Sequence, residues 1–172
     1  RSTLSSSSAA SDVYKRQPVI IPGSDYGIVT TACYQARKFG IYSTMPVQKA
    51  LRLCPKAKLI APDMDKYKNF SLKIHKILLE FTPLIEPASI DEYYLDFVGT
   101  NNLHKASAYT IMRRAAYQIM QELNITVSIG LSYCKFMAKF ASDIKKPFGF
   151  SIINKNEAKY LIANYPIAPV SY

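Results

Sequence analysis

Apolar residues recur every three or four positions along two long stretches of the chain, residues 64–81 and 109–123. That spacing predicts two amphipathic helices, each with one face in a core. Shorter helices are predicted where turn residues bound an apolar run, over residues 34–39, 47–53 and 136–146. A last helix is predicted to begin at residues 154–157, because these residues resemble a capping box. Short β-branched and aromatic runs predict strands at residues 18–21, 28–33, 58–61, 84–90, 93–97, 126–131 and 150–153. Because strands and helices come in clusters and do not alternate regularly, the pattern predicts an α+β fold.

The chain has 172 residues, of which 49% are hydrophobic, and this suits one domain of ordinary size or two small ones that share a core. No apolar run approaches the roughly 18 residues that a membrane-spanning helix needs, which argues against an integral membrane protein. The cysteines Cys33, Cys54 and Cys134 lie far apart and show no metal-binding spacing. We therefore expect reduced thiols and a cytoplasmic protein.

The first 17 residues differ in composition from the rest of the chain. They are rich in serine, show no apolar periodicity and lack the apolar core of a signal peptide. A disordered polar tail is one interpretation. We favour the other, that residues 1–17 are a non-native leader resembling translated sequencing-adapter sequence joined to an incomplete frame.

Basic side chains outnumber acidic ones, with 22 Lys and Arg against 12 Asp and Glu and a net charge of +10. Residues 18–172 alone carry 19 basic and 11 acidic side chains, so the surplus does not come from the leader. Such a surplus favours anionic partners, which are nucleic acid, nucleotides or acidic lipid headgroups. Solubility alone is the alternative explanation.

Three carboxylates, Asp91, Glu92 and Asp96, fall within six residues of an apolar stretch that otherwise favours strands. Carboxylates beside a core are costly to leave unpaired, so they must meet water, a base or a hard cation. Mg²⁺ suits such a pair because it takes few protein oxygens and shares substrate phosphates. The alternative is a solvated hairpin tip.

Tyr34 and Arg37 lie three residues apart, so on a helical turn they share one face, as a phosphate clamp requires. Lys139, Lys145 and Lys146 form a further basic cluster near the end of a predicted helix. Each group has a structural alternative, an ordinary surface face for the first and favourable contact with a helix C-terminus for the second.

Other catalytic patterns are missing from the sequence. It contains no nucleotide-binding loop of the Walker or G-x-G-x-x-G type, and no G-x-S-x-G nucleophile motif. His75 and His104 have no partner at catalytic or ligand spacing, and His75 is predicted to lie on the polar face of its helix.

Four ordered motifs together resemble the Y-family of translesion DNA polymerases, most closely the bacterial DNA polymerase IV branch with its UmuC-type catalytic domain. They are V-T-T-A-C-Y-Q-A-R-K-F-G-I (29–41), M-P-V-Q-K-A-L-R-L-C-P (45–55), I-E-P-A-S-I-D-E-Y-Y-L-D (85–96) and V-S-I-G-L-S-Y-C-K-F-M-A-K-F-A-S-D-I-K-K-P-F-G (127–149). The resemblance covers nearly all of residues 18–172. It implies transfer of a deoxynucleotide to a primer 3′-hydroxyl during translesion synthesis and DNA repair.

The resemblance gives catalytic roles to two carboxylates. Asp91 would be a Mg²⁺ ligand, and Glu92 would sit at the metal that serves the primer 3′-hydroxyl. Two such metals would activate the attacking hydroxyl and stabilise the leaving pyrophosphate. Asp96 looks structural in this comparison.

The resemblance also indicates the groups that bind the incoming nucleotide. Tyr34 and Arg37 match the residues that hold the triphosphate, with Thr31 nearby. Lys146 matches the palm lysine that also reaches the triphosphate, and Lys139 is a secondary candidate.

By the same resemblance the chain divides into parts of a polymerase. Residues 18–29 would be a palm strand region, residues 30–80 a small, mainly helical fingers subdomain, and residues 81–172 a palm that stops before the thumb. The palm is expected to contain a ferredoxin-like sheet with packed helices. The implied partners are primer–template DNA, a deoxynucleoside triphosphate and, through a C-terminal region that is absent, a sliding clamp.

The sequence departs from the family pattern in one respect that bears on activity. The first metal-site Asp of the family lies in a D-x-D-x-F-F-like strand that also carries the steric gate, and nothing similar precedes Pro18. We therefore expect an incomplete two-metal site and a fragment that is inactive alone. The alternatives are a non-catalytic nucleic-acid-binding module with the same fold, a nucleotide cyclase, or, as another branch, a polymerase V catalytic subunit.

Overall fold

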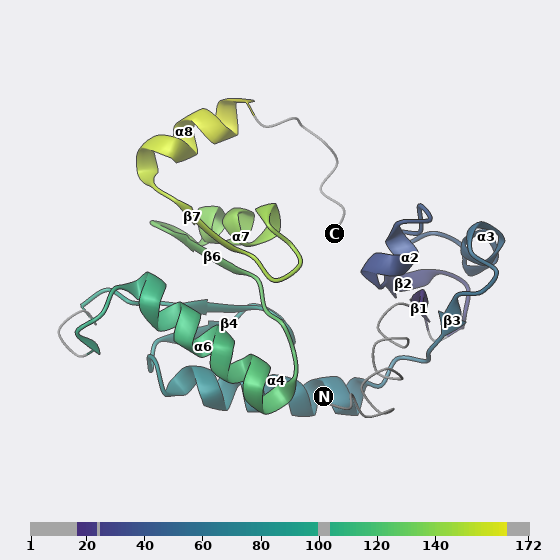
Figure 1. Ribbon diagram of the computed structural model, residues 1–172, viewed down its shortest axis with the longest axis horizontal. Coiled ribbons are helices and arrows are strands. Elements are labelled where there is room, and N and C mark those ends of the chain that lie inside the picture. The colour runs from purple at the N-terminus through teal and green to yellow at the C-terminus, as the bar shows by residue number, and fades with distance from the viewer. Residues whose placement is uncertain (1–16, 24, 100–103, 165–172) are drawn as a thin grey trace, which may run out of the picture. The chain divides into compact units, whose positions relative to one another are not determined.

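The computed structural model describes residues 17–23, 25–99 and 104–164 (Figure 1). Apart from Gln17, the predicted leader lies outside these residues. The chain forms two compact units that divide after Asp63. The predicted boundaries at residues 29/30 and 80/81 follow the family resemblance and stay predictions.

The N-terminal unit contains a three-stranded sheet in the order β2-β1-β3. β1 (Val19–Pro22) pairs antiparallel with β2 (Val29–Ala32) and parallel with β3 (Lys58–Leu59). The chain turns between β1 and β2, where the amide of Gly23 donates to the Ile28 carbonyl at 2.8 Å. The predicted pair of strands joined by a turn is confirmed.

Two short helices complete this unit, α2 (Tyr34–Arg37) and α3 (Val47–Leu53). Gly40, with a φ of +76°, follows the α2 turn in a conformation that side chains disfavour. Pro46 immediately precedes α3, where its fixed φ and missing N–H cost nothing. The buried core lies between the sheet and these helices and comprises Ile20, Val29, Ala32, Ala36, Ile41, Met45, Val47, Ala50 and Cys54.

The C-terminal unit contains two small sheets. β4 (Ile85–Pro87) and β5 (Tyr93–Leu95) form an antiparallel hairpin. β6 (Ile129–Ser132) and β7 (Phe150–Ile153) are parallel, and α7 (Lys135–Ile144) connects them and packs on both. The predicted strand over 126–131 therefore begins only at Ile129, because the residues before it have no ladder partner among the described residues.

Long helices cover the hairpin. α4 (Met64–Leu79) and α6 (Ala108–Leu123) lie side by side (Figure 1), and both pack against β5. The predicted apolar faces are largely confirmed, but Met64, at the start of α4, and Tyr109, at the start of α6, are 51% and 39% exposed. His75 does not lie on a polar face as predicted, because its ring packs edge-on against Tyr93 with centroids 5.8 Å apart.

Local sequence signals determine where α6 and α8 (Lys155–Asn164) begin and end. The Ser107 side chain accepts from the amide of Thr110 at the start of α6, which ends at Asn124 in a left-handed conformation. The predicted capping box at α8 is confirmed, since the amide of Asn154 donates to Glu157 Oε2 at 3.0 Å and the amide of Glu157 donates to Asn154 Oδ1 at 2.9 Å.

These helices and small sheets confirm the predicted α+β class. Within the described residues, strand pairing forms three separate sheets. The same residues contain no helix long and apolar enough to cross a membrane.

Candidate functional site

The two neighbouring carboxylates lie in the turn between β4 and β5. The amides of Ala88 and Ser89 both donate to the Glu92 carbonyl, at 2.9 and 3.3 Å, and so close this turn. The Ser89 hydroxyl donates to Asp91 Oδ1 at 2.6 Å, which orients an exposed carboxylate. Glu92 is half-buried. The Asp91 side chain is therefore exposed to solvent, whereas the Glu92 side chain is in contact with the protein.

Lys139 of α7 binds Glu92 directly. Its ammonium contacts Glu92 Oε1 and also lies 3.8 Å from Asp143 Oδ2, one turn further along the helix. Partial burial is the largest influence on the pKa of Lys139 and lowers it, but the Glu92 hydrogen bond and the charges of Asp143 and Glu92 together raise that pKa above its ordinary value. Lys139 is therefore a cation at neutral pH.

Lys146 is connected to this pair through Asp143. Its ammonium lies 2.6 Å from Asp143 Oδ1, so Glu92, Lys139, Asp143 and Lys146 form one ion-pair chain. Three of these four residues were candidates from sequence, and the structure brings them together. Asp143 was missed, although its spacing of four from Lys139 and three from Lys146 is the helical spacing at which opposite charges pair.

A second lysine of α7 strengthens the contact between this helix and the hairpin. Lys135, one turn before Lys139, pairs with Glu86 of β4. Its ammonium also lies 5.8 Å from the centroid of the Tyr94 ring. α7 thus contacts both strands of the hairpin through lysines on one face.

Replacing Lys139 with methionine tests the ion-pair chain. Because Lys139 and Glu92 are 37% and 41% exposed, we expect a loss of under about 1 kcal/mol at pH 7. A lysine whose pKa is higher in the folded than in the unfolded protein stabilises the fold. This stabilisation is complete at pH values below the unfolded-state pKa, and it is lost as the pH rises through the folded-state pKa. Urea unfolding at pH 7 and pH 11 should therefore show a smaller difference from wild type at the higher pH.

Lys159→Met is the matched control, since Lys159 is exposed on α8. It should change stability at neither pH. A Lys139→Met penalty as large at pH 11 as at pH 7 would mean that lost packing, and not the charge, causes it.

The predicted phosphate clamp lies in the N-terminal unit. The Arg37 guanidinium lies over the Tyr34 ring at 5.2 Å from its centroid, and Arg37 Nε donates to the Ala32 carbonyl at 2.9 Å. This bond orients the side chain through Nε, so the terminal guanidinium nitrogens are the ones that would meet a phosphate. Thr31 is exposed on β2, three residues before Tyr34.

The donor set suits a divalent ion only in part. No group of three or more His, Cys, Asp and Glu side chains forms a metal site within the described residues. Asp91 and Glu92 supply hard carboxylate oxygens, and Mg²⁺ is commonly held by one or two carboxylates together with substrate phosphates. The two carboxylates therefore fit a metal that is shared with a phosphate ligand.

Comparison with known proteins identifies the family. A model of the impB/mucB/samB family matches residues 4–143. The chain belongs to the impB/mucB/samB family. Curated relatives include DNA polymerase IV 1 of Mesorhizobium japonicum, 47% identical over 156 residues, which are 91% of this chain and 36% of that protein. DNA polymerase IV of Brucella melitensis is 45% identical over 154 residues, 90% of this chain and 35% of that protein.

Solved structures agree with this family assignment. DinB from Sulfolobus solfataricus matches with a TM-score of 0.77 at 31% identity, over 90% of this chain and 46% of that one. A ternary complex of Dbh matches with the same TM-score at 32% identity and the same coverage. The predicted resemblance to Y-family polymerases is thus confirmed. This impB/mucB/samB chain spans about a third of the two curated relatives and under half of the two solved chains.

Proposed function

We propose that this chain is the palm and fingers part of a template-directed DNA polymerase of the translesion type. Its reaction would be transfer of a deoxynucleotide to a primer 3′-hydroxyl. The observation that carries the proposal is the exposed Asp91 carboxylate beside Glu92 on the β4–β5 turn, with Glu92 held by Lys139. Relatives named DNA polymerase IV support this branch over polymerase V.

In this proposal Asp91 and Glu92 would hold Mg²⁺, which would stabilise charge at the reacting phosphate. Lys139 would act before any ligand binds, because it neutralises Glu92 and holds its carboxylate against α7. Lys146 would exchange its bond to Asp143 for one to the triphosphate. Asp143 pairs with both Lys139 and Lys146, so it keeps Lys146 near the hairpin while the Lys146 ammonium stays unburied.

Tyr34 and Arg37 would bind the triphosphate from the fingers, with Thr31 beside them. The Arg37 side chain is already oriented by the Ala32 carbonyl, so little rotamer freedom would be lost on binding. The fingers would comprise residues 30–80, and the palm residues 18–29 and 81–172. Positioning and electrostatics, and not covalent chemistry, would be the contribution of these side chains.

The proposed partners are primer–template DNA and a deoxynucleoside triphosphate. Dbh has been solved as a ternary complex and as an insertion ternary complex, which supports this proposal for a chain of similar fold. A sliding clamp and a cytoplasmic location remain expectations. So does the lack of activity in these 172 residues alone.

Nucleotide binding by the chain tests the proposal. Calorimetry with deoxythymidine triphosphate should detect binding in MgCl₂ and none in EDTA. Arg37→Ala should weaken binding by about tenfold, the effect of one charge-assisted hydrogen bond. Lys38→Ala, which removes a neighbouring exposed charge, should have little effect.

Two other outcomes identify the rival functions. A nucleic-acid-binding module would bind DNA in a salt-dependent way but show no Mg²⁺-dependent affinity for the nucleotide. A nucleotide cyclase would convert ATP alone to a cyclic product. Either result would overturn the polymerase proposal.

A further inference from the structure

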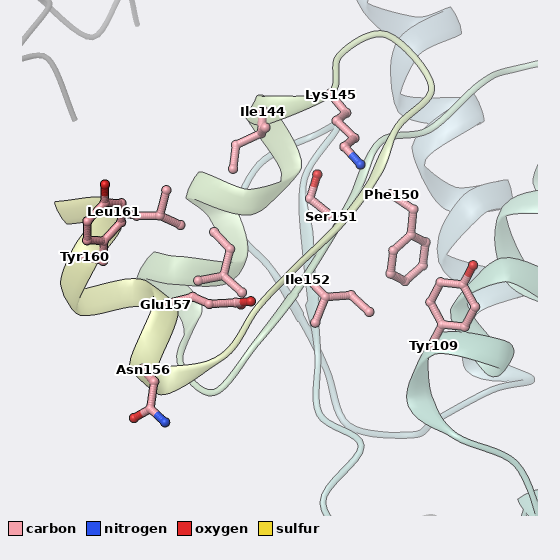
Figure 2. Close-up of a pocket in the computed structure, with 11 residues that line it drawn as sticks. Tyr109, Ile144, Lys145, Phe150, Ser151, Ile152, Asn156, Glu157, Tyr160 and Leu161 are labelled. Carbon is pink, nitrogen blue, oxygen red and sulfur yellow. The ribbon is translucent and has the colours of Figure 1, made fainter. Parts of the chain in front are cut away.

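Two hollows in the C-terminal unit share Tyr109 as a common wall. The first has a volume of about 820 Å³ and lies between β7, α8 and the start of α6. Figure 2 shows Tyr109 beside Phe150 at one end of it and Tyr160 at the other. Lys145 supplies a positive charge to its lining. This hollow therefore combines aromatic rings with a cation.

The second hollow follows the exposed face of α6 and has a volume of about 510 Å³. Tyr109, Arg113 and Tyr117 recur at every fourth position, so they form a stripe along one side of the helix. The Arg113 guanidinium lies 5.7 Å from the Tyr109 ring centroid, and its Nη1 donates to the Tyr109 hydroxyl at 3.3 Å. Arg114 lines the same hollow, and Tyr117 is 62% exposed.

The two hollows together are called the Tyr109 groove. Its charged lining residues are Lys145, Arg113, Arg114 and Glu157. Glu157 accepts the hydrogen bond from the Asn154 amide that caps α8, so its carboxylate is already used within the fold. The groove thus presents an excess of positive charge next to exposed aromatic rings.

We propose that the Tyr109 groove binds single-stranded DNA. Bases would stack on the rings of Tyr109, Tyr117 and Tyr160, and phosphates would meet Arg113 and Arg114. Rings that alternate with cations along a track are the features that hold a single strand without reading its sequence. An acidic peptide would use the cations but would leave the exposed rings without a matching surface. The groove involves neither Asp91 nor the Tyr34–Arg37 clamp, so this proposal does not rest on polymerase activity.

Fluorescence anisotropy of the full chain with a labelled thymidine oligonucleotide about 12 nucleotides long tests the proposal. EDTA is present throughout, so that metal-dependent nucleotide binding cannot contribute. Arg113→Ala/Arg114→Ala is expected to weaken binding by about tenfold or more at low salt, because two phosphate contacts disappear. Tyr117→Ala should weaken oligonucleotide binding by about fivefold or more, because it removes a ring on which a base stacks. Tyr117→Phe keeps the ring and should retain wild-type affinity.

The matched control is Lys73→Ala/Lys76→Ala on α4, which removes the same charge from exposed positions that line neither hollow. It should weaken binding less than twofold, within the error expected for a distant surface change. An equal loss in this control would show that net charge alone binds the oligonucleotide. That result, wild-type binding by Tyr117→Ala, or tighter binding of a polyglutamate peptide than of the oligonucleotide would each overturn the proposal.

Discussion

Replacing Asp91 with asparagine is expected to weaken Mg²⁺-dependent binding of a deoxynucleoside triphosphate by roughly 10- to 100-fold. Loss of a group that only orients a metal ligand has an effect of this size, and loss of the ligand itself should weaken binding at least as much. Asparagine keeps the shape of the side chain and an oxygen for the Ser89 hydroxyl, which donates at 2.6 Å. It removes only the negative charge that a divalent ion needs. Calorimetry in MgCl₂ measures the change.

Asp96→Asn is the control for this substitution. Asp96 follows β5 in the same hairpin, is exposed, and accepts from the amide of Val98 at 2.8 Å, so it has a local structural role. Nucleotide affinity should stay at the wild-type value in this variant. Equal losses for Asp91→Asn and Asp96→Asn would mean that general electrostatics, and not a metal site at Asp91, governs binding.

Replacing Gly130 with alanine is expected to destabilise the fold by about 3 kcal/mol or more, at the upper end of what overpacking costs. A Cβ atom at this position in β6 would lie 1.9 Å from the Ala138 carbonyl oxygen and 2.5 Å from the Ser142 amide nitrogen. Both atoms belong to the backbone of α7, so no side chain can move aside. Either the helix separates from the strand or the unit unfolds.

Urea unfolding followed by circular dichroism measures this loss. Gly23→Ala is the control, because the nearest atom to its added Cβ would be Asp25 Oδ1 at 3.4 Å, an ordinary contact. That variant should unfold at nearly the wild-type urea concentration. A Gly130→Ala protein as stable as wild type would contradict the close packing of α7 on β6.

Much of the secondary structure follows from the sequence because local rules decide it. The three-to-four spacing predicts α4 and α6, and the capping box at Asn154 predicts the start of α8. Strand length is less predictable, since it depends on a partner strand that the pattern does not reveal. The strand expected from residue 126 therefore begins only at Ile129.

Side-chain partners were predictable only within a helix turn or a motif. The carboxylates of Asp91 and Glu92 stand out in an apolar stretch, and the motif resemblance carried the choice of Lys139 and Lys146. Nothing local indicates that Lys139 would reach Glu92, 47 residues away in the chain, or that His75 would pack on the Tyr93 ring. Such contacts arise from the packing of α7 and α4 around the hairpin.

A chimera tests the central claim, that this chain carries the working palm and fingers of a polymerase. Residues 18–164 would replace the matching segment of DNA polymerase IV 1 of Mesorhizobium japonicum, to which the chain is 47% identical. Primer extension in MgCl₂ is the measurement, with circular dichroism to verify folding. We expect the chimera to extend a primer and its Asp91→Asn copy to add no nucleotide. A folded chimera that binds primer–template DNA but adds no nucleotide would contradict the central claim.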